Sequence, residues 1–310
     1  MWSTCEKFRP GISLAICVAI LTVRAQGQNR GVYPLGMSAT NSGVTPGPGF
    51  TYVNQLLFYS RDHAKDDVGS TLAVTGENYV LMDMNTLVWV SKKTFLGGAK
   101  YSAAATLPFA KNSLTSNIQG KVSGGGGFAD SYYLPFILGW NRERVAIRVI
   151  YGFLAPTGRF AASASNNVGS GYWTHTLSSG QTLYLNSSKA LILAAFQMYE
   201  FHTKQEGTGI HPGENFDLDY SFLGSLPAPM DVRLQIGLVG YEQRQTTAKT
   251  GPNISVAASD ERYAVNALGF AVTSAFPKHK ASLGFKYFKE FSNRSTFQGY
   301  SVQLSGSISF

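Results

Sequence analysis

The sequence contains few charged residues and, after residue 25, no long hydrophobic run. Aspartate, glutamate, lysine and arginine make up 14% of its 310 residues, compared with about 25% in typical soluble domains. Beyond residue 25 the longest uninterrupted hydrophobic run spans residues 190–196, whereas a transmembrane helix needs roughly 18 apolar residues. Aromatic residues reach 13%, and disordered chains have few of them. A helical membrane protein and a disordered chain are therefore disfavoured, and the abundant tyrosine, serine and β-branched residues favour β structure.

The first 25 residues have the pattern of an export signal. Lys7 and Arg9 form a short basic start, residues 12–23 are apolar, and Ala25 offers a small residue at a cleavage site. We expect cleavage after Ala25. The alternative, a retained membrane anchor, is disfavoured because the apolar stretch is too short to span a bilayer comfortably. Both cysteines of the sequence lie in this segment, at Cys5 and Cys17. The mature chain then contains no cysteine and no disulfide.

Apolar and polar residues alternate along much of the remaining chain. In residues 300–310 apolar side chains occupy the even positions and serine or glutamine the odd ones, with Gly306 as the single gap. The same alternation appears in residues 145–153, 216–222, 232–238 and 281–287. This period of two indicates strands with one apolar and one polar face. Soluble β-sandwiches also alternate, but here the polar face carries aspartate, arginine and lysine well inside the strands, which suits a wet lumen better.

The connectors between the expected strands mostly alternate between long and short, as in outer-membrane barrels with long extracellular loops and short periplasmic turns. The strands are expected at residues 49–60, 78–91, 96–109, 127–140, 143–154, 170–178, 188–203, 214–225, 230–244, 260–276, 279–291 and 297–310. The strand at 170–178 and the connector after it have the weakest pattern. The sequence therefore predicts an all-β fold, a transmembrane antiparallel β-barrel of about 12 strands over residues 49–310, preceded by the cleaved signal peptide.

The alternation also predicts which polar side chains point into the lumen. An arginine or lysine that faces lipid at the bilayer midplane destabilises the barrel by about 2–4 kcal/mol, so the face of each strand that carries charge is expected to face inward. The residues expected to face the lumen are Asp83, Asn85, Arg144, Arg148, Asp217, Asp219, Arg233, Gln235, Lys280, Lys286 and Glu290. Asp217 and Asp219 share a strand face, and we expect them to form a cross-strand ion-pair ladder with Arg233. A catalytic or Ca²⁺-binding role for this pair is the weaker alternative.

Several segments match the pattern of one family, in order along most of the mature chain. They are Tyr33-Pro34-Leu35-Gly36, Pro46-Gly47-Pro48-Gly49, Gly127-Phe128-Ala129-Asp130, residues 134–140, 151–158 and 212–220, and the serine-rich last strand. On these segments the chain resembles the putative meta-pathway of phenol degradation family of outer-membrane proteins, which is distantly similar to outer-membrane long-chain fatty-acid transporters. The resemblance implies a monomeric barrel that passes hydrophobic or aromatic compounds. Residues 26–48 would then be either a plain periplasmic leader or a small hatch inside the lumen.

Motifs that carry catalysis or hold a cofactor are missing from the sequence. It contains no nucleophile elbow, no G-x-x-x-x-G-K-[ST] phosphate loop and no H-E-x-x-H zinc motif. The histidines at 63, 175, 202, 211 and 279 do not follow metal-ligand spacing. No basic run suggests contact with a nucleic acid. We therefore expect no enzymatic activity, no metal and no cofactor; an outer-membrane enzyme that uses Asp83 and His211 is a minor alternative.

The leading functional hypothesis is passive uptake of small hydrophobic or aromatic solutes through a porin-like channel in the outer membrane of a Gram-negative cell. Its expected partners are the outer-membrane lipid, these solutes and the outer-membrane assembly machinery. Resemblance to other outer-membrane barrels implies that Phe310, a C-terminal aromatic residue, is the assembly signal. The alternative is a structural or adhesive barrel that acts through its long extracellular loops.

Overall fold

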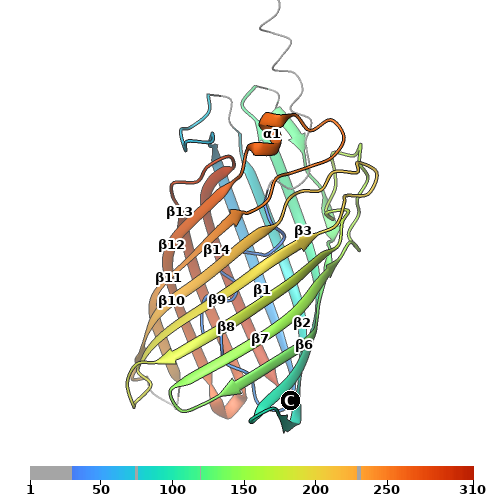
Figure 1. The fold of residues 1–310 in the computed structure, drawn as a ribbon. Helices are drawn as coiled ribbons and strands as arrows, with labels where there is room; N and C mark the ends of the chain where they lie inside the picture. Colours follow the sequence, from blue (N-terminus) through green and yellow to red (C-terminus); the bar gives the residue numbers. More distant parts are fainter. Residues whose placement is uncertain (1–29, 74–75, 119, 229–231) are drawn as a thin grey trace, which may run out of the picture.

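The computed structural model describes residues 30–73, 76–118, 120–228 and 232–310. The predicted signal peptide, residues 1–25, lies outside this part of the chain. The described part forms one closed, antiparallel β-barrel whose strands are tilted against the barrel axis (Figure 1). The prediction of an all-β transmembrane barrel is thereby confirmed.

Twelve long strands form the barrel wall in the described part of the chain. They are β1 (Gly49–Ala64), β2 (Asn78–Phe95), β3 (Ala99–Ser116), β6 (Ser131–Asn141), β7 (Val145–Ala155), β8 (Thr174–Tyr184), β9 (Leu191–His202), β10 (Asn215–Leu226), β11 (Arg233–Gln245), β12 (Ala264–Phe276), β13 (Ala281–Glu290) and β14 (Phe297–Ser309). Each pairs with its neighbour in the chain, and β1 pairs with β14, which closes the sheet. Closure gives every strand a partner on both sides, as a membrane-spanning sheet requires.

The connections are long at one end of the barrel and short at the other. The long ones carry the small elements β4 (Gly120–Ser123), β5 (Gly126–Phe128) and α1 (Val256–Asp260), and we call this end the loop end. The short turns, which include the 3-10 helix η1 (Pro277–His279), lie at the turn end together with the C-terminus (Figure 1). Within the described residues, no helix is long and apolar enough to cross a membrane.

One strand differs clearly from its expected position. We expected a strand at 170–178 and a connector from 179 to 187, but β8 begins at Thr174 and continues to Tyr184. Ser179 and Gln181 lie on its outer face, where they form hydrogen bonds with each other and with Gln197 of β9. Because polar residues occupy both faces of this strand, its sequence shows no alternation, and the prediction ended the strand too early.

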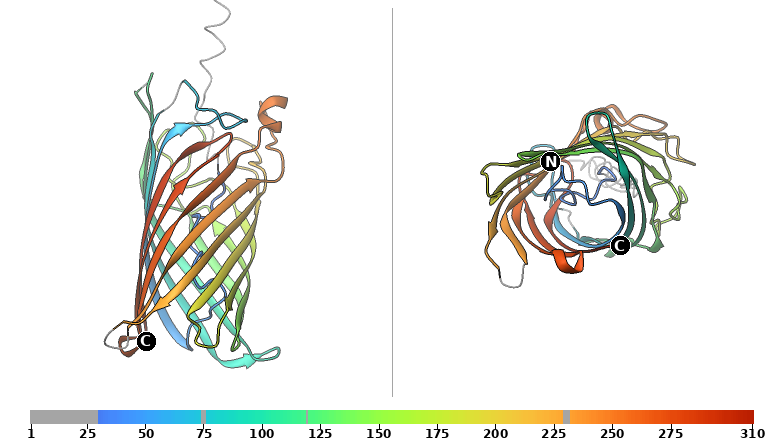
Figure 2. Two further views of the ribbon diagram at one scale, coloured as in Figure 1. Left: turned by 90° about the vertical axis from the view of Figure 1, so that its left-hand side faces the viewer. Right: turned by 90° about the horizontal axis from the view of Figure 1, so that it is seen from below.

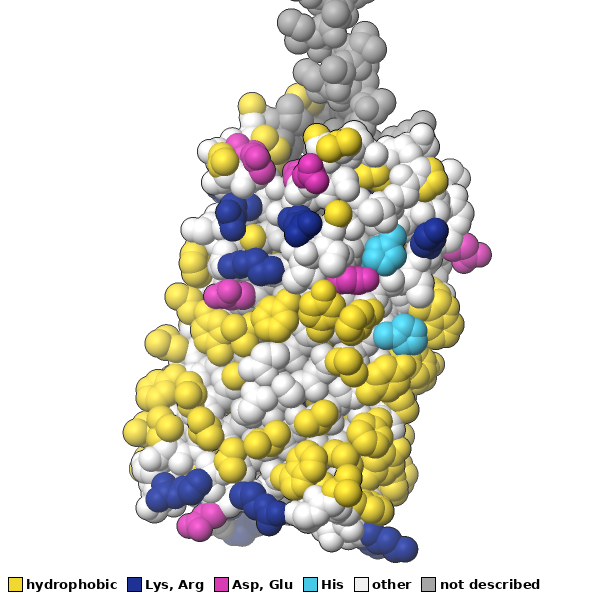
Figure 3. Space-filling view, in the orientation of Figure 1, with side chains coloured by type: hydrophobic (Ala, Val, Ile, Leu, Met, Phe, Trp, Pro, Cys, Tyr) yellow, Lys and Arg dark blue, Asp and Glu magenta, His cyan; other side chains and the backbone are white. Residues whose placement is uncertain are grey.

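The barrel has an apolar outside, and its inside combines buried polar and charged side chains with apolar clusters. Outward-facing residues such as Leu238 and Leu283 are 66% and 60% exposed, whereas inward-facing Asp219 and Glu200 are fully buried. On the face shown in Figure 3, charged side chains gather above and below a zone of hydrophobic and uncharged ones. This arrangement matches a wall that contacts lipid in the middle and water or headgroups at its two ends.

Candidate functional site

The lumen contains the chain that precedes the first strand. Residues 30–48, which we call the luminal segment, run inside the barrel towards the start of β1 at the turn end (Figure 2). Ala39 and Ser42 of this segment are 0% exposed and Leu35 is 2% exposed. The segment contains no strand or helix, so its backbone groups need partners other than a sheet ladder.

Near the loop end, Glu290 of β13 holds the start of the segment. Arg30 donates two hydrogen bonds to its carboxylate, from Nη1 at 2.8 Å and from Nη2 at 3.2 Å. Arg61 of β1 approaches the same carboxylate at 3.7 Å, and the Tyr241 hydroxyl donates to it at 3.1 Å. The Gly299 amide adds a further hydrogen bond at 3.0 Å. Glu290 is therefore a buried carboxylate that two guanidinium groups neutralise.

Glu200 of β9 binds the next residues of the segment. Its carboxylate accepts hydrogen bonds from the Val32 amide at 3.0 Å and the Tyr33 amide at 2.7 Å. Asn215 of β10 donates to the same carboxylate at 3.2 Å, and His202 lies 3.3 Å away. A buried carboxylate thus serves as the acceptor for two consecutive peptide groups of the segment, which makes these hydrogen bonds charge-assisted.

In the middle of the lumen, Asp219 and Lys286 bind one turn of the segment from two strands. Asp219 of β10 accepts from the Tyr33 hydroxyl at 2.6 Å and from the amides of Gly36 and Ser38 at 2.9 and 3.0 Å. Lys286 of β13 donates to the carbonyl oxygens of Gly36 and Met37 at 2.8 and 2.7 Å. Gly36 has a φ of +83°, a left-handed conformation that glycine adopts without strain.

Towards the turn end, the segment packs directly against the backbone of the wall. Arg148 of β7 donates from Nε to the Ser42 carbonyl at 2.7 Å, and the Gly43 amide donates to the Thr182 hydroxyl at 3.0 Å. A Cβ atom on Gly43 would clash with the Ala146 carbonyl. Glycine here permits a close approach of two backbones, which is why a segment without regular structure can fit beside the wall.

Most of the polar residues expected in the lumen lie on its wall. Arg148, Asp217, Asp219, Gln235, Lys286 and Glu290 point inward, and Asp217 accepts a hydrogen bond from Gln243 at 2.6 Å. Arg233 lies on the same strand face as Gln235 at the turn end, where it is exposed, and Arg144 and Lys280 lie in the turns at that end. The expected ion-pair ladder is wrong, because Asp219 lies opposite Tyr241 and Arg233 lies opposite Ala275.

The inward orientation expected for Asp83 and Asn85 is also wrong. Their neighbours in β2, Met82 and Met84, pack inward against Leu57, so Asp83 and Asn85 must point outward. Both faces of β2 carry apolar side chains, because the inner face packs against other luminal residues while the outer face meets lipid. The rule that places charge inside therefore selected the wrong face of this strand.

Sequence reasoning missed Arg30, Arg61 and Glu200 as luminal binding residues. Arg61 lies one position beyond the expected end of its strand. Glu200 is the last but two residue of β9, whose inner face is otherwise mostly apolar, with Ile192 and Phe196 buried there. A single carboxylate on an apolar inner face does not produce an alternation of apolar and polar residues that the sequence could show.

Phe310 is 67% exposed at the turn end and donates its amide hydrogen to the Phe50 carbonyl oxygen at 2.9 Å. Its role in assembly stays a prediction.

Comparison with known proteins identifies the family. The family model described as "Putative MetA-pathway of phenol degradation" matches residues 61–305, and the chain belongs to this family. Among solved structures it is similar to the COG4313 outer membrane channel from Pseudomonas putida F1, with a TM-score of 0.70 and 14% identity, covering 87% of this chain and 98% of that one. The beta domain of the Bordetella autotransporter BrkA is similar at a TM-score of 0.51 and 10% identity, covering 85% and 100%. No curated protein matches the sequence.

Proposed function

We propose that the protein is an outer-membrane channel for the passive uptake of small hydrophobic or aromatic solutes. Its apolar exterior, the buried charged residues of its lumen and the alternation of long loops with short turns support insertion in an outer membrane with the loops outside. The family description connects the chain with phenol degradation, and the Pseudomonas protein of similar fold is described as an outer membrane channel. These two descriptions support the class of protein and the class of solute.

The observation that carries the proposal is the luminal segment and the way in which it is bound. Residues 30–48 are held mainly by side chains such as Glu200, Asp219 and Lys286, while the strand ladder closes without them. The segment can therefore change position without opening the wall. We infer that it acts as a hatch, and that a solute crosses the lumen by passing beside it or by displacing it.

Uptake by intact cells tests the proposed function. Porin-deficient Gram-negative cells that express the protein should take up phenol and toluene faster than cells with an empty vector. Barrel variants that do not insert provide the background rate. Unchanged uptake by cells whose outer membrane contains the folded protein would contradict the proposal and leave the adhesive barrel as the better hypothesis.

A further inference from the structure

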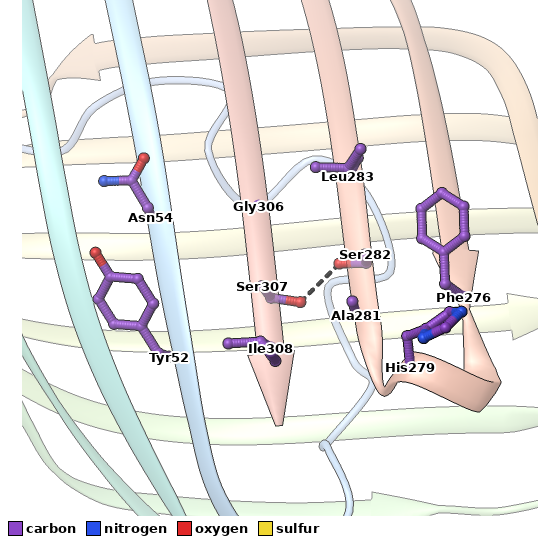
Figure 4. Close-up of a pocket in the computed structure, with 10 residues that line it drawn as sticks. All are labelled: Tyr52, Asn54, Phe276, His279, Ala281, Ser282, Leu283, Gly306, Ser307 and Ile308. Atoms are coloured by element: carbon purple, nitrogen blue, oxygen red, sulfur yellow. Dashed lines mark hydrogen bonds between the residues drawn. The ribbon is translucent and has the colours of Figure 1, made fainter. Parts of the chain in front are cut away.

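A groove lies on the outer wall of the barrel near the turn end, across β12, β13, β14 and β1 (Figure 4). It consists of two adjoining depressions of about 490 and 480 Å³, open to the outside of the barrel, which share Asn54, Leu283 and Gly306. Tyr52, Phe276, Leu283 and Ile308 are among the residues that line it, together with polar residues such as Asn54 and His279. Cavities of roughly 300–1,000 Å³ have the size of sites for small molecules.

The groove exists because Gly306 has no side chain. Gly306 of β14 lies between Asn54 of β1 and Leu283 of β13, on the outward-facing parity of the strand. A Cβ atom there would meet no atom nearer than Leu283 Cδ2 at 3.6 Å, and the residue is not in the left-handed region. The backbone therefore does not require glycine at this position, and a larger side chain would fill the groove without straining the strand.

A polar cluster adjoins the groove on the lipid-facing wall. Asn54 Nδ2 donates to Asp83 Oδ1 at 2.5 Å and to Asn85 Oδ1 at 3.3 Å, and the Tyr52 hydroxyl donates to Asn85 Oδ1 at 2.5 Å. Leu56, directly opposite Asp83 in the sheet, is 40% exposed. Ionisable groups at membrane depth are costly and usually face a lumen or a partner, so an Asp83 that faces lipid indicates a functional site.

The cluster orients Asn54 towards the groove as a hydrogen-bond acceptor. The amide nitrogen of Asn54 points towards Asp83, to which it donates a hydrogen bond. Its Oδ1 atom then turns away from β2, as Figure 4 shows. Among the described residues none donates a hydrogen bond to Asn54 Oδ1.

We propose that this groove binds a small aromatic molecule with a hydroxyl group, a phenol, that has dissolved in the surrounding lipid. The ring lies over Gly306, between the side chains of Tyr52 and Leu283, and the hydroxyl donates to Asn54 Oδ1. The class of ligand rests on the proposed function, but the site is on the outer wall and is separate from the lumen. It gives the barrel a place where a membrane-dissolved phenol is recognised by both its ring and its hydroxyl group.

Binding to the protein in lipid nanodiscs tests the proposal. The probes are 4-fluorophenol and fluorobenzene, each titrated and followed by ¹⁹F NMR. The wild type should bind 4-fluorophenol saturably and about tenfold more tightly than fluorobenzene, the effect of one hydrogen bond. Asn54→Leu should weaken binding of 4-fluorophenol to the level of fluorobenzene. Gly306→Leu should abolish binding of both probes.

Gly224→Leu is the matched control, because Gly224 is an outward-facing glycine of β10 whose added Cβ would likewise meet no atom closer than 3.6 Å, its nearest neighbour being the Ile236 carbonyl oxygen at 3.8 Å. This variant should bind like the wild type. Equal binding by the wild type and Gly306→Leu, or equal affinity for the two probes, would overturn the proposal. A third result would also overturn it: no saturable binding of either probe, together with a dimer in nanodiscs that Gly306→Leu disrupts. The groove would then be an interface between two copies of the chain.

The uptake assay separates this site from the proposed function. If the wild type binds 4-fluorophenol in the groove but cells show no increase in uptake, the site stands and the channel proposal fails. If uptake increases but no saturable binding to the groove occurs, the channel proposal stands and the groove proposal fails.

Discussion

Asp219 and Lys286 hold the peptide groups of a single turn from two different strands of the barrel. Asp219 accepts from the amides of Gly36 and Ser38, and Lys286 donates to the carbonyls of Gly36 and Met37. These backbone groups are buried or partly buried and have no sheet partner, so leaving them unpaired would be costly. The luminal charges therefore act mainly on the backbone of the luminal segment, and less on each other.

Replacing Asp219 with asparagine should loosen this turn. Asp219→Asn removes the charge from three hydrogen bonds, and a hydrogen bond to a charged group contributes about 1.5–3 kcal/mol. We expect openings of the channel in planar bilayers to become at least about tenfold more frequent, since 1.4 kcal/mol corresponds to a factor of ten. Asp260→Asn, the same change in the exposed helix α1, should leave them unchanged. Equal behaviour of the two variants would contradict this role of Asp219.

Glu290 should be important for stability because two buried arginines share its carboxylate. In Glu290→Gln, Arg30 and Arg61 lose their common carboxylate, and removal of one partner from a buried ion pair costs about 3–5 kcal/mol. We expect a comparable loss in the free energy of unfolding, measured by urea titration in lipid vesicles. Adding Arg61→Gln should recover part of this loss, because it removes one of the uncompensated charges. Strictly additive effects would show that the two groups do not interact.

At the scale of elements, the luminal segment is separable from the barrel wall. The closing ladder runs from Thr51–Ser309 to Ala64–Phe297 between β1 and β14 and does not include residues 30–48. Deleting residues 30–45 should therefore leave a barrel that still resists dissociation in cold detergent, while its ion conductance rises several-fold. Both properties can be measured on one preparation, by gel shift on heating and in planar bilayers. A deletion variant that folds but conducts like the wild type would exclude a hatch role for the segment.

Strands with one apolar and one polar face were predictable from the sequence. Strands whose two faces have a similar polarity were not. The alternation in β14 placed that strand to within one residue of its observed end. The predicted strand ends before the observed end of β8, because Ser179 and Gln181 put polar groups on the outer face of β8. In β2 both faces are largely apolar, so Asp83 was assigned to the wrong side. The contacts of the luminal segment were beyond prediction, because Asp219 binds backbone amides, which every residue except proline presents.

At the scale of the whole molecule, successive side chains of each strand alternate between the lipid-facing outside of the barrel and its interior. Leu238 is 66% exposed to the outside while its neighbour Val239 is 1% exposed in the lumen. A shift of register by one residue would exchange the two faces along a whole strand. The polar cluster of Asn54, Asp83 and Asn85 is a local departure from this pattern, and it lies beside the groove that Gly306 creates.

The two faces should respond differently to the same new charge. Leu238 lies outward in the middle of β11, and arginine at the bilayer midplane costs about 2–4 kcal/mol, so Leu238→Arg should lower the free energy of unfolding by that amount. Gln235→Arg places the same charge on the lumen face of the same strand and loses only neutral hydrogen bonds with Asn41 and Thr273, at about 1 kcal/mol each. Urea unfolding in vesicles measures both variants. If Gln235→Arg proved the more destabilising of the two, lipid would not be on the side of Leu238, and the assignment of the outer wall, including the groove at Gly306, would have to be abandoned.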